Sequence, residues 1–202
     1  KSPAGVCEFD GRLSLVRLRP SGRLLLYARA NLAASGSRHV QLTTSDDEGV
    51  SWSPFQPIAL RGHSPEDGAD IYFFSAARNP ADNGTTLLAL FPMVQHFRGC
   101  ICIAFSRDGL EWSAPMPLVS AAAMGQRAHD QPAAGVIERG DRVDLYVHEG
   151  VPLINIDQTT PLALRARLRR RGEARRTELV RYSVPRATLL RWTQQALADL
   201  FC

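Results

Sequence analysis

The sequence predicts an all-β fold, namely a β-propeller of four-stranded antiparallel blades with a short C-terminal helix. The first observation is a loop motif: "SDDEGVSWS" from Ser45 is nearly repeated by "SRDGLEWSAP" from Ser106, 61 residues later. The second is that each copy follows three β-rich runs and precedes a fourth. Repetition of one supersecondary unit indicates a repeat architecture, and four short strands per unit are typical of a propeller blade.

The β-rich runs define the units. In the first two units they are residues 12–18, 24–30, 38–45 and 55–60, then 70–77, 85–94, 100–106 and 114–119. A third unit begins with two similar runs, passes into an Arg-rich stretch and resumes later, at residues 129–138, 142–150 and 178–184. We therefore expect one partial propeller domain over residues 1–202, with blades at 9–60, 69–119 and 128–185.

A C-terminal amphipathic helix is predicted over 186–202, directly after Pro185. Its apolar positions are Leu189, Leu190, Trp192, Leu197, Leu200 and Phe201. Three blades do not close a ring, and an open wedge exposes two sheet edges. We therefore expect a fragment of a five- or six-bladed ring whose missing blades precede Lys1, or protomers that complete one another, with the helix covering an edge strand.

The motif loop has its own chemistry. Ser45 and Asp47 can bond to the backbone of a tight turn, Gly49 can take the left-handed conformation, and Trp52 can fold back as an apolar plug. Ser106, Asp108, Gly109 and Trp112 form a version one residue shorter. The motif is therefore expected to staple the hairpin between the third and fourth strands.

These residues resemble the Asp-box, S-x-D-x-G-x-x-W, of sialidase-like (BNR-repeat) propellers, and the shorter copy looks like loops of five-bladed glycosidase propellers. The resemblance covers about residues 9–155. It implies a propeller fold and a glycosidase-like hydrolase of carbohydrate, and it implies a structural role for the Asp-box residues, which lie away from the catalytic centre in that superfamily.

Three carboxylates recur at one point of the repeat. Asp10, Asp70 and Asp130 are each 60 residues apart, just before or at the first strand of a unit. First strands line the central channel of a propeller, so these side chains are expected to converge near the axis. Structural capping or tethering is the competing interpretation of each Asp.

Converging carboxylates suit glycoside hydrolysis, in which one carboxyl group protonates the leaving oxygen and another attacks the sugar or activates water. We expect Asp10 to be base or nucleophile, Asp70 electrostatic support, and Asp130 or Glu149 the acid. The resembling five-bladed families generally use Glu as the acid, which is why Glu149 is a candidate beside Asp130.

A second set of residues suits an acidic sugar. Arg29, Arg78 and Arg127 fall near the rim of different units, and guanidinium groups bind carboxylates bidentately. His129 stands beside Asp130 and is a further substrate-binding candidate. Surface or salt-bridge roles remain the alternative for the arginines, and Tyr27 and Tyr72 are most simply packing residues.

Other partners and cofactors find little support. The net charge of +4 is local, because seven of the 24 basic residues lie within Arg165–Arg176 and no aromatic residues interleave there, so a solvated segment is favoured over a nucleic-acid surface. No apolar run reaches the length of a membrane helix. The five histidines show no HxH or HExxH spacing, so neither a metal nor a cofactor is predicted.

Cys100 and Cys102 share a strand face and are not expected to bridge each other. A secreted or endomembrane-lumenal location is favoured only by an N-G-T sequon at Asn83, and oligomeric state is open.

Two other functions compete with a glycosidase. One is a non-catalytic carbohydrate-binding or protein-interaction propeller, which predicts binding without turnover. The other is a purely structural repeat domain of a larger protein.

Overall fold

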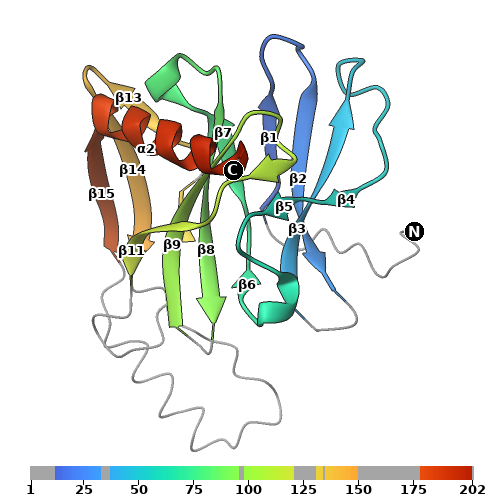
Figure 1. Cartoon of the computed structure of the whole chain (residues 1–202), viewed down its shortest axis with the longest axis horizontal. Coiled ribbons are helices and arrows are strands. Elements are labelled where there is room, and N and C mark those ends of the chain that lie inside the picture. The colour runs from blue at the N-terminus through green and yellow to red at the C-terminus, as the bar shows by residue number, and fades with distance from the viewer. Residues whose placement is uncertain are drawn as a thin grey trace, which may run out of the picture.

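The computed structural model describes residues 12–32, 37–95, 98–120, 131–133, 135–149 and 178–201. These residues form three mainly antiparallel sheets that stand side by side, with one α-helix across the second and third (Figure 1). Asp10, Arg127, His129, Asp130 and the Arg165–Arg176 run lie outside the described residues.

The first sheet follows the simple meander expected of a blade, in the order β1-β2-β3-β4. Its strands are β1 (Ser14–Arg17), β2 (Leu24–Asn31), β3 (Arg38–Ser45) and β4 (Gln56–Pro57). Leu25 and Tyr27 lie on the same face of β2, the face that meets the second sheet, and both are buried. The expectation that Tyr27 is a packing residue is confirmed.

The second sheet is central and the most deeply buried. It contains β5 (Ala59–Leu60), β6 (Asp70–Ile71), β7 (Ser75–Arg78), β8 (Leu87–Gln95), β9 (Arg98–Ser106), β10 (Glu111–Trp112) and β11 (Met116–Ser120). All are antiparallel to their neighbours except β5, which pairs parallel with β10 and thereby links the first unit to the second. Residues 87–91 of β8 are buried without a break because both faces are covered, which explains the continuous apolar run there.

The third sheet pairs β14 with the two short inner strands on one side and with β15 on the other. Its strands are β12 (Gln131–Pro132), β13 (Ile137–Arg139), β14 (Arg142–Glu149) and β15 (Glu178–Pro185). No further strand pairs with β15 among the described residues; the chain continues directly into α2 (Arg186–Ala198).

The predicted C-terminal helix is confirmed and starts directly after Pro185. Its buried stripe is Leu189, Thr193 and Leu197, spaced by one helical turn, and it contacts β9, β14 and β15. Short 3-10 helices occupy Pro65–Asp67 (η1), Pro80–Asp82 (η2) and Asp199–Phe201 (η4).

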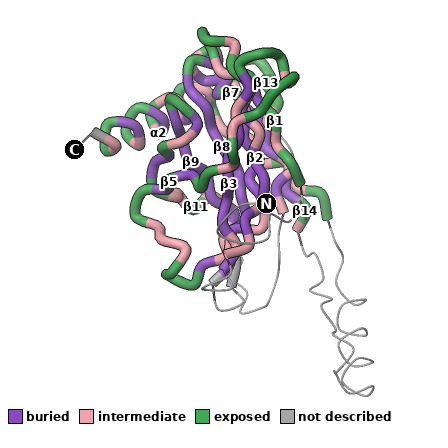
Figure 2. Tube along the Cα trace, turned by 90° about the vertical axis from the view of Figure 1, so that its right-hand side faces the viewer, coloured by how far each residue is buried: buried purple, intermediate pink, exposed green. Residues whose placement is uncertain are grey.

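Two apolar clusters hold the sheets together, and they appear as the purple interior of Figure 2. Between the first and second sheets, the Phe74 ring lies 5.4 Å from Tyr27 and 4.8 Å from Trp112, centroid to centroid. Between the second and third sheets, Phe105 packs with Val143 and with Leu189 of α2. Full burial of each large side chain contributes about 1.5–3 kcal/mol, so these clusters fix the mutual placement of the sheets.

Candidate functional site

The innermost strands of the three sheets meet along one line. The Ser14 hydroxyl of β1 donates to the Ala76 carbonyl of β7 at 3.0 Å and accepts from the Ala76 N–H at 2.9 Å. The Ser75 hydroxyl accepts from the Gly135 N–H, between β12 and β13, at 3.1 Å. Two serine side chains thus join the inner strands of all three sheets.

One cavity opens along this line and a second opens beside it, and we call these two the axial cavities. The first has a volume of about 580 Å³ and is lined by residues of all three inner edges, among them Arg12, Ser14, Phe73, Ser75, Arg78 and Gly135. The second, about 460 Å³, lies on the third sheet and is lined by Arg12, Gln131, Ala133, His148, Glu178 and Leu179. Both volumes fall in the range of about 300–1,000 Å³ that small-molecule sites occupy.

Arg12 lines both cavities. Its guanidinium carbon stands 5.1 Å above the centre of the Phe73 ring, and its Nη1 donates to the Pro132 carbonyl at 2.9 Å. A guanidinium held against an aromatic face keeps its remaining N–H groups available to acceptors such as sugar hydroxyls or carboxylates. Sequence reasoning missed Arg12 because it belongs to no motif; its position two residues after Asp10 was the only signal.

Asp70 is the first residue of β6, as the alignment of the repeats predicts, but its carboxylate is already bound to Arg38. One carboxylate oxygen accepts from the Arg38 backbone N–H at 2.8 Å and the other from Arg38 Nη1 at 3.1 Å. The Arg38 guanidinium also lies 4.9 Å above the Tyr72 ring. Asp70 therefore ties β6 of the second sheet to β3 of the first, and it does not line either axial cavity.

Glu149 ends β14, where it is half-buried and accepts a short hydrogen bond from the Tyr182 hydroxyl of β15. Its neighbour His148, which pairs with Gln131, lines the 460 Å³ cavity. Side chains alternate along a strand, so His148 and Glu149 project from opposite faces of the third sheet.

The two described candidate arginines lie in different places. Arg78 ends β7, is exposed and lines the 580 Å³ cavity. Arg29 is on β2, half-buried on the same face as Leu25 and Tyr27, and it lines neither axial cavity. Arg78 thus lines the same cavity as Arg12, and Arg29 does not.

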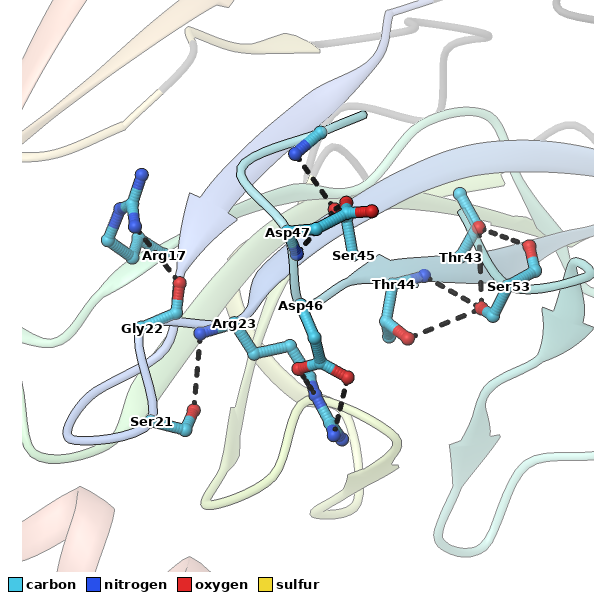
Figure 3. Close-up of polar contacts among 11 residues, drawn as sticks. Arg17, Ser21, Gly22, Arg23, Thr43, Thr44, Ser45, Asp46, Asp47 and Ser53 are labelled. Atoms are coloured by element: carbon cyan, nitrogen blue, oxygen red, sulfur yellow. Dashed lines mark hydrogen bonds and ion pairs between the residues drawn. The ribbon is translucent and has the colours of Figure 1, made fainter. Parts of the chain in front are cut away.

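The first motif loop is built as a hydrogen-bonded turn after β3 (Figure 3). The Ser45 hydroxyl donates to Asp47 Oδ1 at 2.8 Å and accepts from the Gly49 N–H at 2.8 Å. Asp47 also accepts from the Ser51 N–H at 2.8 Å and from the Ser51 hydroxyl at 2.5 Å, and these bonds lower the pKa of Asp47 to about 2. The Trp52 indole N–H closes the turn on the Gly49 carbonyl at 3.0 Å.

The second loop repeats this network. The Ser106 hydroxyl donates to Asp108 at 3.1 Å and accepts from the Gly109 N–H at 2.8 Å, and the Trp112 indole donates to the Gly109 carbonyl at 2.8 Å. Asp108 accepts from the backbone N–H groups of Leu110 and Glu111 in place of the Ser51 contacts of the first loop. The same atoms thus fold both loops, although the second is one residue shorter.

The two tryptophans differ in burial. Trp112 is fully buried against the first sheet and acts as the expected plug, whereas Trp52 remains 38% exposed. Leu24 lies on the face of β2 opposite Leu25, and Trp52 and Leu24 both come within 3.7 Å of the position that a Cβ on Gly49 would take. The burial of this motif position therefore depends on the neighbouring sheet, not on the loop itself.

The fold of the chain is similar to that of solved fructofuranosidase structures. The fold matches the fructofuranosidase of Schwanniomyces occidentalis in complex with fructose, with a TM-score of 0.52 and 18% identity, over 67% of this chain and 28% of that one. The same enzyme complexed with fructosyl-erythritol gives a TM-score of 0.51 at 18% identity over the same shares. The chain has the fold of a partial β-propeller.

The likeness extends to the fold alone, because the identity is low and the chain spans just over a quarter of the length of these enzymes. A leech intramolecular trans-sialidase aligns at a TM-score of 0.33 and 15% identity, over 82% of this chain and 23% of that one, too low to carry an argument. No protein-family model matches the sequence. No helix among the described residues is long and apolar enough to cross a membrane.

Proposed function

We propose that the chain is part of a glycosidase-like propeller that binds a glycan in the axial cavities and hydrolyses a glycosidic bond there. The observation that carries the proposal is one cavity between the three inner strands whose lining includes Arg12, Phe73 and Arg78. An aromatic ring and two guanidinium groups beside one cavity suit a hydroxyl-rich or acidic sugar. In fructofuranosidases of the same fold, fructose and fructosyl-erythritol are the bound sugars, so fructosides head the substrate classes to test.

The proposed catalytic groups are carboxylates at or just before the inner strands in the sequence, together with Glu149 at the end of β14. Asp70 opens β6, Asp130 immediately precedes β12 in the sequence, and Asp10 precedes β1 by four residues. Asp10 serves as base or nucleophile, and Asp130 or Glu149 as acid. Asp70, which is paired with Arg38 and lines neither axial cavity, is limited to electrostatic support from outside the cavities.

The test uses the complete protein and a panel of aryl and natural glycosides, headed by fructosides. We expect Asp10→Asn and Asp130→Asn to lower kcat by about 10²-fold or more, since each removes a general acid, base or nucleophile. Asp46→Asn is the matched control, because Asp46 is exposed and is paired with Arg23, directly before β2. If the Asp10 and Asp130 variants keep full activity, the proposed hydrolysis is wrong.

A second candidate is a carbohydrate-binding propeller without turnover. It is favoured by one observation: of the proposed carboxylates that the structure describes, Asp70 is bound by Arg38 and Glu149 by Tyr182. This alternative predicts saturable sugar binding that Arg12→Gln weakens and no hydrolysis of any glycoside on the panel. Turnover that Asp130→Asn removes would exclude it.

A further inference from the structure

Two histidines from different sheets meet at a third cavity, away from the axis. His39 is on β3 of the first sheet, and His63 is in the turn after β5, which belongs to the second sheet. Their ring centroids are 5.8 Å apart. Both line a cavity of about 400 Å³ whose other walls include Arg61, Glu111, Trp112 and Leu200.

Each ring keeps one nitrogen that is buried and without a hydrogen-bond partner. His39 is 2% exposed, and its Nε2 lies 3.0 Å from the Ile58 carbonyl. A carbonyl oxygen only accepts, so Nε2 carries the proton and Nδ1 holds a free lone pair. His39 Nδ1 and His63 Nε2 are both buried and unpartnered. Buried polar atoms without partners are rare and commonly mark an absent water or ion.

We propose that His39 and His63 bind one divalent transition-metal ion of the nickel, copper or zinc class. Imidazole nitrogen is a preferred ligand of these ions. A His ligand typically donates its other ring N–H to a carbonyl or carboxylate, which is the arrangement that Ile58 gives His39.

The separation of the rings fits a shared ion. With metal–nitrogen bonds of about 2.0–2.1 Å, two imidazoles on one ion have ring centroids about 5 Å apart at a tetrahedral angle and about 6 Å apart when opposite. The observed 5.8 Å lies between these arrangements. No cluster of three His, Cys, Asp or Glu ligands forms in the part of the chain that the structure describes. The remaining coordination positions would have to be filled by water or by a small ligand in the cavity.

An ion at this point would join the first sheet to the second, beside the parallel pair of β5 and β10. Its binding is thus expected to stabilise the fold as well as to occupy the cavity, because an ion that binds only the folded state raises the unfolding midpoint. This gives the site a readout that does not depend on glycan chemistry.

The experiment is a calorimetric titration of the untagged, complete protein with Ni²⁺ alone, together with thermal unfolding with and without Ni²⁺. Nickel is chosen because it suits imidazole, whereas thiolates such as Cys100 select softer ions. His63→Ala is the main variant, since His63 lies in a turn and is less buried than His39. His39→Phe, which keeps a ring in the buried position, is the second variant. His148→Ala on β14 is the matched control.

We expect saturable 1:1 binding of Ni²⁺ and a higher midpoint temperature of unfolding, which a chelator reverses. His63→Ala is expected to lower the affinity for Ni²⁺ at least about 10-fold, and His148→Ala is expected to leave it unchanged. The proposal is overturned if the wild-type protein does not bind Ni²⁺ at millimolar concentration. It is equally overturned if folded His63→Ala binds as tightly as the wild type, or if His148→Ala removes the binding.

Discussion

Asn79 Nδ2 donates a 2.8 Å hydrogen bond to the Thr193 hydroxyl, joining the end of β7 to the middle of α2 across 114 residues of sequence. Both side chains are buried. Asn79 Nδ2 also bonds the Thr86 hydroxyl at 3.1 Å, and its Oδ1 accepts from the Ala81 N–H at the start of η2. One amide thus fixes both the η2 turn and the position of the helix over the second and third sheets.

Thr193→Val is expected to lower the free energy of unfolding by about 1–3 kcal/mol. The substitution keeps the shape but leaves a buried Asn79 N–H without one acceptor. Urea unfolding of the wild type, Thr193→Val, Asn79→Ala and the double variant measures the coupling between the two residues. Thr188→Val, on the same helix, is the control, because Thr188 is only half-buried and accepts its hydrogen bond from the exposed Arg191 side chain. Additive effects of the two single variants would show that the bond contributes nothing of its own.

Gly109→Ala is expected to lower the free energy of unfolding by about 2–5 kcal/mol, combining left-handed backbone strain with overpacking. Gly109 has φ +83°, and a Cβ there would lie 2.6 Å from the Tyr27 hydroxyl and even closer to the Leu25 side chain. Gly62→Ala is the matched control, because Gly62 has φ +66° with no atom within 4 Å of the added Cβ. Equal losses in urea unfolding for the two variants would contradict the packing argument.

Asp47 is expected to titrate at about 2, because Ser51 and Ser45 donate hydrogen bonds to its ionised form. A folded-state pKa below the unfolded value of about 3.9 means that the stabilisation is complete above that value and is lost as the pH falls through about 2. Carboxyl-carbon NMR measures the pKa directly. Ser51→Ala should raise the pKa of Asp47. Ser53→Ala should leave it unchanged, because the Ser53 hydroxyl accepts from the Thr44 N–H and does not contact Asp47. An Asp47 pKa near 3.9 in the wild type would refute the turn chemistry.

Cys100 is expected to react with iodoacetamide well before Cys102. The two sulfurs lie 3.3 Å apart on the same face of β9. When Cys100 is ionised, its sulfur accepts a hydrogen bond from the Cys102 thiol, which lowers the pKa of Cys100 to about 7 and raises that of Cys102. Cys102 is also fully buried. Mass spectrometry across a pH series should give a labelling midpoint near 7 for Cys100, which Cys102→Ala moves upward. Labelling of Cys100 only above about pH 8.5, the range of an ordinary thiol, would contradict this assignment.

The fold could be predicted from local patterns because they recur. The two motif loops place the same Ser, Asp, Gly and Trp atoms around one turn, and period-two apolar residues mark the strands that lead into them. The C-terminal helix followed from Pro185 and the apolar positions after it. In each of these cases the determining contacts are local, within a few residues along the chain.

The candidate site depended on residues that no local pattern connects. The pairing of Asp70 with Arg38, of Arg12 with Phe73, and of His39 with His63 each joins two sheets across 24 to 61 residues of sequence. The sequence by itself determined the strands, the turns that connect them and the helix, because hydrogen bonding and side-chain alternation within short segments specify them. Only the tertiary structure decided which side chains share a cavity and which tryptophan is buried, because sheet-on-sheet packing brings together positions whose separation along the chain carries no signal.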